Sequence, residues 1–266
     1  MKMEEPRHMG KCALCGEHTV LKDSHLIPKW AYRRLQKTDE GRTDPIRIEG
    51  GSAVQTSDQV TMYLLCAACE HRFSTREDYV SRLTQTDPEG TLKILGSVTR
   101  QAPPLAEVVQ LDSELDIDAI VYFAASVIWR SCVMKHGCTL GERYELAFRR
   151  YLLGETDFPS NVASMNLVIL EPSGLVRHPE RYVSFPSSSK VPNAWLHGFT
   201  VCGLTFRCFV GGSLDAGMKM VNLAGGSSPK YALLRNPEGL NDFVEVHRTT
   251  AAATPRGKLA LLNVWR

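Results

Sequence analysis

Two Cys-x2-Cys pairs are the residues of this 266-residue chain whose type and spacing most directly indicate chemistry. The pairs are Cys12 with Cys15 and Cys66 with Cys69. A two-residue spacer lets both thiolates of a pair reach one ion, and tetrahedral zinc requires four such ligands. Two redox pairs or four buried free cysteines are the alternative, but neither pair lies in the strand and helix context of a thioredoxin-like site. We therefore expect one structural Zn²⁺ held by the four cysteines, with His18 and His71 as substitutes that could replace one thiolate.

Residues suited to hydrolysis with a second metal lie close to these pairs. His25 follows Ser24 in the segment between the pairs, and Glu70 directly follows Cys69. Hydrolysis of a phosphodiester needs a hard cation, a base that activates water and a group that shields the leaving oxygen. Carboxylate oxygens suit Mg²⁺-type cations, and a histidine can take a proton from water near neutral pH. A shared zinc would hold His25 beside Glu70, and a purely structural His25 is the alternative.

The order of these motifs resembles the HNH endonuclease family, whose core is a ββα-metal, treble-clef-like unit. The resemblance covers residues 10–83 and lies in Cys12-x2-Cys15, Ser24-His25-Leu26-Ile27-Pro28 and Leu64-Leu65-Cys66-x2-Cys69-Glu70. It implies a metal-dependent DNA endonuclease in which His25 is the general base and Glu70 is a ligand of a catalytic Mg²⁺ or Mn²⁺.

The sequence departs from this family at the residue before the general base. The family usually has Asp there, a metal ligand in several members, whereas this chain has Ser24. Glu77 lies seven residues after Glu70, so on a helix it shares the same face and could compensate. A surface carboxylate that pairs with Arg76 or Arg82 is the alternative for Glu77.

The departure at Ser24 leaves a second function open, a non-catalytic zinc treble clef that binds nucleic acid or protein. A third reading is a toxin or effector nuclease whose C-terminal half docks a partner. The segment that contains His25 favours the nuclease, because a purely structural zinc module has no need of a histidine at that position.

Charge places any DNA contact in local patches, because the net charge of the chain is only +2. Lys29 and Arg33 lie just beyond His25, and Arg72 and Arg76 follow the second cysteine pair. We expect these four cations to contact phosphates, and a solvated helix face is the alternative for both clusters.

Composition indicates an ordinary globular protein, with 43% hydrophobic and 23% charged residues. Residues 1–10 are polar and lack the apolar core of a signal peptide. The apolar segment 117–136 is interrupted by Asp118, Arg130 and Lys135, so we expect a buried helix and no membrane span. Zinc-spaced cysteines favour a reducing, cytoplasmic location over a disulfide framework.

The elements that must position the site alternate over the first third of the chain. The pattern predicts a strand at 19–27, a short helix at 30–36, a strand at 60–65 and a helix at 69–83. Residues 37–59 are rich in Gly, Asp, Thr and Ser, which predicts a long loop. We expect 1–100 to be the zinc-bound module and 101–116, with Pro103-Pro104, to be a linker.

The remaining residues, 117–266, predict an α+β domain of unknown role. A buried helix at 117–136 is followed by a helix that a capping box at Thr139–Glu142 opens and Gly154 ends. Short strand-like runs then predict a largely antiparallel sheet, at 164–170, 181–185, 194–202, 204–210, 218–223, 243–247 and 259–265. This region could recognise a target, hold a homo-oligomer together, bind a protein partner or itself restrain the nuclease.

Overall fold

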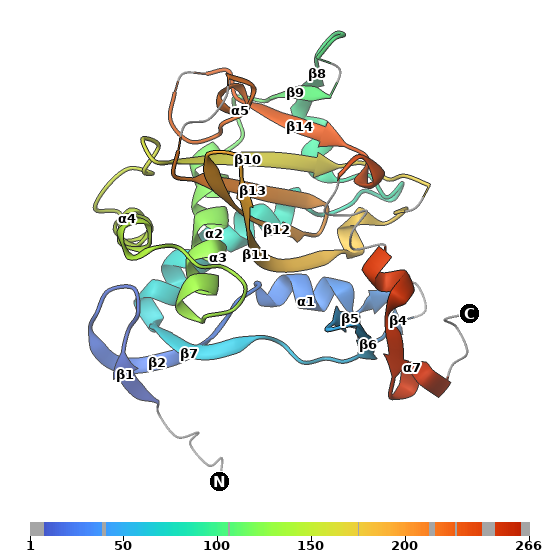
Figure 1. Ribbon diagram of the computed structural model, residues 1–266, viewed down its shortest axis with the longest axis horizontal. Coiled ribbons are helices and arrows are strands. Elements are labelled where there is room, and N and C mark those ends of the chain that lie inside the picture. The colour runs from blue at the N-terminus through green and yellow to red at the C-terminus, as the bar shows by residue number, and fades with distance from the viewer. Residues whose placement is uncertain are drawn as a thin grey trace.

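Helix α3 (Ile117–Val133) lies between helix α2 (Ala67–Leu83) and a large sheet (Figure 1). The computed structural model describes residues 8–38, 41–105, 107–174, 176–212, 216–226, 228–240 and 248–261. Asp116 caps α3, because its carboxylate accepts a hydrogen bond of 2.8 Å from the backbone N–H of Ala119. The helix is apolar on nearly all sides, and such a helix is stable only when it is buried.

Aromatic side chains show how α3 is covered on its two sides. Tyr122 and Trp129 pack edge-on against Phe73 of α2. On the opposite side, Phe123 packs against Phe199 and Phe206 of the large sheet. One hydrophobic core therefore includes residues from both halves of the chain.

The first cysteine pair and its surroundings form a small antiparallel sheet followed by α2. The sheet has the order β1 (Met9–Lys11), β2 (His18–His25), β7 (Thr61–Cys66), and α1 (Lys29–Leu35) follows β2. Residue His25 pairs with Thr61, and α2 begins directly after β7. The predicted strands and helices of this region are confirmed; its identity as a treble clef stays a prediction.

The large sheet has seven strands in the order β11-β12-β13-β10-β14-β9-β8. The strands are β8 (Val98–Arg100), β9 (Val108–Leu111), β10 (Ala163–Leu170), β11 (Val183–Val191), β12 (Ala194–Val201), β13 (Leu204–Val210) and β14 (Tyr231–Arg235). All eight residues of β10 are buried, as expected for a central strand covered on both faces. Among the described strands of this sheet, only β10 and β14 pair in parallel, so the predicted α+β class and largely antiparallel sheet are confirmed.

The predicted linker differs from the structure. Strand β9 lies within 101–116, and it pairs with β14 on one side and with β8 on the other. The buried side chains of Val108, Val109 and Leu111 explain this, because they join the sheet that covers α3. The segment that contains Pro103-Pro104 lies in the short connection between β8 and β9.

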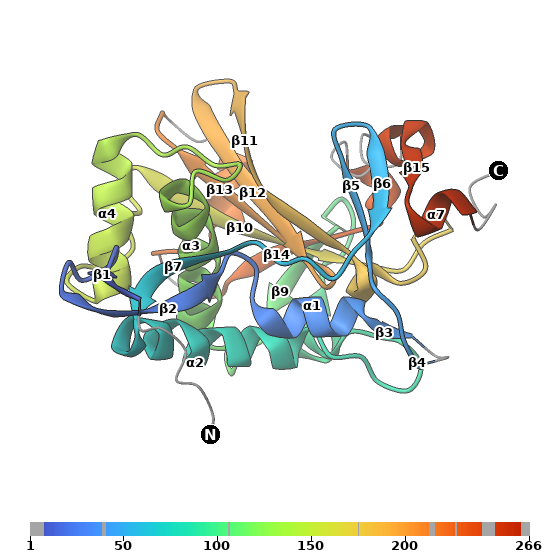
Figure 2. The same ribbon diagram turned by 90° about the horizontal axis from the view of Figure 1, so that it is seen from below.

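The predicted loop at 37–59 is also wrong. It contains the strands β3 (Lys37–Thr38), β4 (Gly41–Arg42), β5 (Ile46–Glu49) and β6 (Ser52–Gln55). Gly50 and Gly51 have φ values of 55° and 71°, which favour glycine and allow the tight turn between β5 and β6. Strand β15 (Thr254–Arg256) then pairs in parallel with β6, and Ala53 packs against Ala253 and Leu259. Figure 2 shows the small sheet of β5, β6 and β15 beside one end of α1.

Several predictions for the last third also need correction. The sequence predicts a strand at 218–223, but α5 (Ala216–Met220) occupies the first half of this range. The sequence also predicts a strand at 259–265, but residues 259–261 belong to helix α7 (Lys258–Leu261). The rest of that predicted strand, and the whole of the one predicted at 243–247, lie outside the described residues. Single-turn helices occur at η1 (Lys93–Ser97), η2 (Pro179–Arg181) and η3 (Pro237–Gly239).

For helix α4 (Glu142–Leu153), the predicted start is wrong and the predicted end is confirmed. Gly141 is its N-cap and no side chain caps it, so the predicted capping box at Thr139 is not formed. Gly154 ends the helix in the left-handed region with φ 77°, as predicted. Within the described part of the chain, no helix is long and apolar enough to cross a membrane.

Candidate functional site

The two cysteine pairs come together into one cluster. The four sulfur atoms lie within 4.8 Å of one another, and those of Cys15 and Cys66 are 3.9 Å apart. Tetrahedral zinc with Zn–S bonds of about 2.3 Å places its sulfurs about 3.8 Å apart. The four cysteines could therefore hold a metal such as zinc. His18 and His71 are exposed and lie outside this cluster, so neither replaces a thiolate.

Backbone N–H groups support the negative charge of this cluster. The N–H of Cys66 donates to the sulfur of Cys12 at 3.3 Å, and the N–H of Cys69 donates to the sulfur of Cys66 at 3.5 Å. Burial raises the pKa of Cys12, but backbone N–H donors from Cys15, Cys66 and Leu14 outweigh burial and lower this pKa to about 7. Burial raises the pKa of Cys69. The backbone donors thus favour the thiolate form of Cys12, which is the form that binds a metal.

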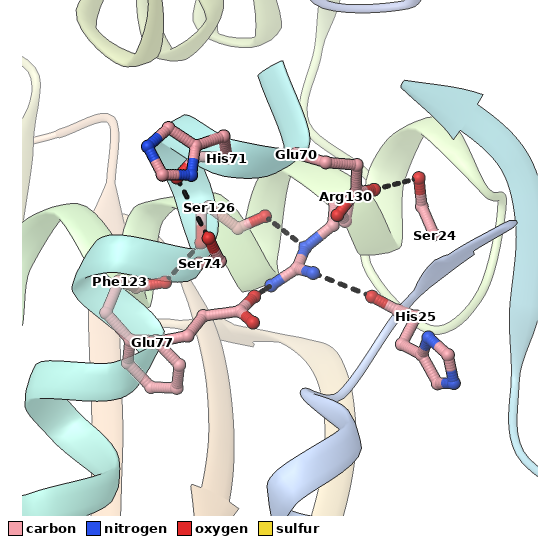
Figure 3. Close-up of polar contacts among 9 residues, drawn as sticks. All are labelled: Ser24, His25, Glu70, His71, Ser74, Glu77, Phe123, Ser126 and Arg130. Carbon is pink, nitrogen blue, oxygen red and sulfur yellow. Dashed lines mark hydrogen bonds and ion pairs between the residues drawn. The ribbon is translucent and has the colours of Figure 1, made fainter. Parts of the chain in front are cut away.

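Ser24 and Glu70 meet next to the cluster. Ser24, on β2, is 1% exposed, and its hydroxyl donates a hydrogen bond to the carboxylate of Glu70 in the first turn of α2 (Figure 3). Side chains alternate along a strand, which turns Ser24 toward α2 and leaves Asp23 exposed. The pairing of Ser24 with Glu70 follows from the junction of β7 and α2 at Cys66, because that junction places the start of α2 beside β2.

His25 joins the same region through its backbone. Its carbonyl oxygen accepts a hydrogen bond of 2.7 Å from a guanidinium nitrogen of Arg130. In Figure 3 its imidazole points away from Glu70 and from Arg130. His25 is half-buried, and the centroid of its ring lies 6.4 Å from the centroid of the Tyr32 ring. The imidazole is therefore partly open to solvent on the outer side of the β2 end.

Glu77 has a different partner from those the sequence suggested. Its carboxylate accepts a hydrogen bond of 2.6 Å from Arg130, and its side chain is only 15% exposed. It pairs with neither Arg76 nor Arg82. The signal for Arg130 in the sequence is a charged residue within a mostly apolar helix, but that signal does not identify His25 and Glu77 as its partners on β2 and α2.

Oxygen and nitrogen ligands do not gather into a second cluster of three. Among the residues that the structure describes, only the four cysteines bring three or more His, Cys, Asp or Glu ligand atoms together. Glu70, Glu77 and His25 thus form no complete cage for a cation. Mg²⁺ is commonly bound by one or two carboxylates together with waters and substrate phosphates, so a cage is not needed for it.

The two predicted basic clusters differ in their surroundings. Arg72 donates to the carbonyl of Leu153 at 2.7 Å, at the end of α4, and the guanidinium of Arg76 lies 4.7 Å from the ring of Tyr122. These two side chains therefore connect α2 to α4 and α3. Lys29 and Arg33 lie exposed on α1, where their charges face solvent.

No protein-family model, curated protein or solved structure matches this chain. The function must therefore be inferred from the residues of the site, and three features define it. These are the four-cysteine cluster, the contact between Ser24 and Glu70, and the end of β2 at His25.

Proposed function

We propose that this protein is a metal-dependent endonuclease that hydrolyses DNA phosphodiester bonds. The observation that carries the proposal is the contact between Ser24 and Glu70 beside the four-cysteine cluster. It places a carboxylate, a hydroxyl and the following His25 around one end of β2. The resemblance to HNH endonucleases supplies the roles of His25 and Glu70, and Ser24 stands where that family usually has Asp.

The four cysteines have a structural role in this proposal. A Zn²⁺ bound by Cys12, Cys15, Cys66 and Cys69 would join the loop before β2 to the start of α2. Such a site contributes on the order of 10 kcal/mol to folding in small zinc modules. The zinc would have no open position for substrate, because four thiolates complete its tetrahedron.

Glu70 and His25 have different roles in the proposed reaction, one as a metal ligand and the other as the general base. The carboxylate of Glu70, with the hydroxyl of Ser24, supplies hard oxygen ligands for Mg²⁺ or Mn²⁺. A divalent cation there would polarise the phosphate and stabilise the departing 3′ oxygen. The half-buried imidazole of His25 takes the proton from the attacking water, and the product retains a 5′ phosphate.

Exposed cations on α1 fit the same substrate. Lys29 and Arg33 are one helical turn apart and follow His25 closely in the chain. They would contact the phosphate backbone beside the scissile bond and make binding depend on salt.

A non-catalytic zinc module that binds nucleic acid or protein is the second candidate. The observation in its favour is that the Glu70 carboxylate is already hydrogen-bonded to Ser24, while the His25 ring points away from Glu70. In that case the same polar contacts would only join β2 to α2.

Nicking of supercoiled plasmid decides between the two candidates. We expect wild-type protein to nick DNA with Mg²⁺ or Mn²⁺. His25→Ala should lower the rate by about 10²- to 10⁴-fold, because a general base is removed. Its zinc content and melting temperature should stay unchanged. His18→Ala is the matched control, since His18 is exposed at the other end of β2.

Two outcomes would reject the nuclease. Equal nicking by wild type and His25→Ala would place the activity elsewhere or in a contaminant. No nicking by either protein with any divalent metal, together with intact DNA binding, would establish the non-catalytic module.

A further inference from the structure

Arg130 is an unusual residue to find inside this protein. It is 1% exposed and belongs to the largest fully buried side chains of the described core. Its neighbours on α3 are almost all apolar. A guanidinium in such surroundings is costly unless its donors are satisfied and its charge is paired.

Three elements satisfy this guanidinium, as Figure 3 shows. One terminal nitrogen donates to the backbone carbonyl of His25 at 2.7 Å, and the other donates to Glu77 at 2.6 Å. Its Nε donates to the carbonyl of Ser126 at 3.4 Å, one turn earlier on α3. The ring of Phe73 lies 5.4 Å from the guanidinium carbon. Arg130 therefore joins β2, α2 and α3 at one point.

The carbonyl of His25 lies where the strand ends. His25 is the last residue of β2, and the chain then turns at Pro28 into α1. A charged donor at 2.7 Å fixes the orientation of the peptide plane that follows His25. The direction of the imidazole depends on this backbone, because the side chain leaves from the same Cα.

We infer that Arg130 is a positioning residue for His25, and that Glu77 orients Arg130 instead of binding the catalytic metal. The planar guanidinium can meet two acceptors at once, which a lysine ammonium on a flexible stem does not reproduce. The helix that forms the core of the molecule would thus hold the general base in place. This inference rests on the proposed function for its effect on rate, but the contact itself can be tested without activity.

The central experiment removes the buried pair as a unit. In the double variant Arg130→Met with Glu77→Leu, apolar side chains of similar size replace both charges, a change that buried ion pairs often tolerate. The variant should stay folded while the His25 carbonyl loses its donor. We expect the imidazole NMR signals of His25, assigned with His25→Ala, to shift and broaden in the double variant.

Nicking and metal dependence give the second readout. Misplacement of a reacting group by about 1 Å can cost about 10²-fold in rate, so kcat should fall by about that factor. The KM for plasmid and the Mg²⁺ concentration for half-maximal rate should not change. A weaker response to Mg²⁺ in the double variant would identify Glu77 as a metal ligand and overturn this inference.

Two further variants separate positioning from general destabilisation. Arg130→Lys keeps a cation beside Glu77 but lacks the two-pronged fork, so it tests the contact if the double variant does not fold. Arg34→Met is the matched control, because Arg34 also donates to backbone carbonyls, those of Thr84 at 2.6 Å and Ser81 at 3.1 Å. It should leave the His25 signals unchanged.

The outcomes distinguish this inference from the proposed function. Unchanged His25 signals in folded Arg130 variants would overturn the positioning role, whatever the nicking assay shows. If wild-type protein does not nick DNA at all, the proposed function fails, and the NMR signals still decide whether Arg130 positions His25.

Discussion

Ser24 determines how strongly the proposed site can hold a cation. Its hydroxyl occupies the position from which a carboxylate would add a second negative ligand beside Glu70. A neutral hydroxyl binds Mg²⁺ more weakly than a carboxylate does. The site as it stands would depend on the substrate phosphate to complete the coordination of the ion.

The variant Ser24→Asp tests this dependence. Two carboxylates in contact repel each other, so the variant should be less stable than wild type by about 1–3 kcal/mol without metal. Added Mg²⁺ should relieve the repulsion and raise its melting temperature more than that of wild type. Thermal melts with and without Mg²⁺ provide the measurement.

Ser24→Ala is the control for this experiment. It removes the hydrogen bond to Glu70 at a cost of about 1 kcal/mol and adds no charge. Its melting temperature should respond to Mg²⁺ no more than that of wild type. If Mg²⁺ does not raise the melting temperature of Ser24→Asp, no cation binds beside Glu70.

At the scale of elements, the cysteine cluster and the packing of α2 stabilise different parts of the same region. The cluster joins the loop before β2 to the start of α2, whereas the rest of α2 packs on α3 through Phe73. The cysteine cluster and the packing of α2 on α3 can therefore be disrupted independently of each other. Loss of a metal should loosen the small sheet without releasing the middle of α2.

The variant Cys66→Ser should lose bound zinc and destabilise β1, β2 and β7 by several kcal/mol, since metal binding contributes directly to folding. Backbone amides in 8–25 and 61–66 should exchange with solvent faster, while those in 73–83 keep their protection. Elemental analysis and hydrogen exchange measure both effects.

Cys132→Ser serves as the comparison, because Cys132 is a half-buried cysteine of α3 outside the cluster. It should keep its zinc. Wild-type protein that contains no zinc after purification would contradict the structural role of the cluster. Equally faster exchange of backbone amides in 73–83 and in the small sheet of Cys66→Ser would contradict the separate stabilisation of these two parts.

At the scale of the whole molecule, the region that carries the site depends on the remaining residues. Besides the contact of Arg130 with His25, Arg149 of α4 donates to the carbonyl of Leu14 at 2.6 Å, between the first two cysteines. Phe73 packs on Tyr122 and Trp129 within a shared core. The later part of the chain thus acts as a scaffold for the candidate site.

A fragment of residues 1–100 with zinc should therefore fail to fold cooperatively. It would expose Phe73 to water and leave Glu77 without its cation. We expect poor dispersion in its NMR spectrum and no cooperative thermal transition. Addition of a separately made fragment of 108–266 is the control, because it supplies α3 and should restore both.

A well-dispersed spectrum of the isolated 1–100 fragment would contradict this dependence. It would instead support the division into a zinc module and a separate later domain that composition and the Pro103-Pro104 segment predicted.

The sequence by itself determined the features that depend on neighbouring residues. Cysteine spacing predicted a four-ligand cluster, and hydrophobic periodicity predicted β2, β7, α2 and α3, because each of these patterns is local. The glycines at 50 and 51 also carried a local signal for a hairpin, but the polar composition of 37–59 obscured it. Strand β6 pairs with its neighbour β5, but its second partner, β15, comes from about two hundred residues later in the chain.

The tertiary structure alone decided how the site is held. Arg130 is 105 residues from His25 and 53 from Glu77, and their contact depends on how α3 crosses α2 and β2. Helical periodicity gives the buried face of a helix but not the element that covers it. For the same reason, the sequence did not reveal that Arg72 and Arg76, predicted to contact phosphates, also contact α4 and α3 in the folded chain.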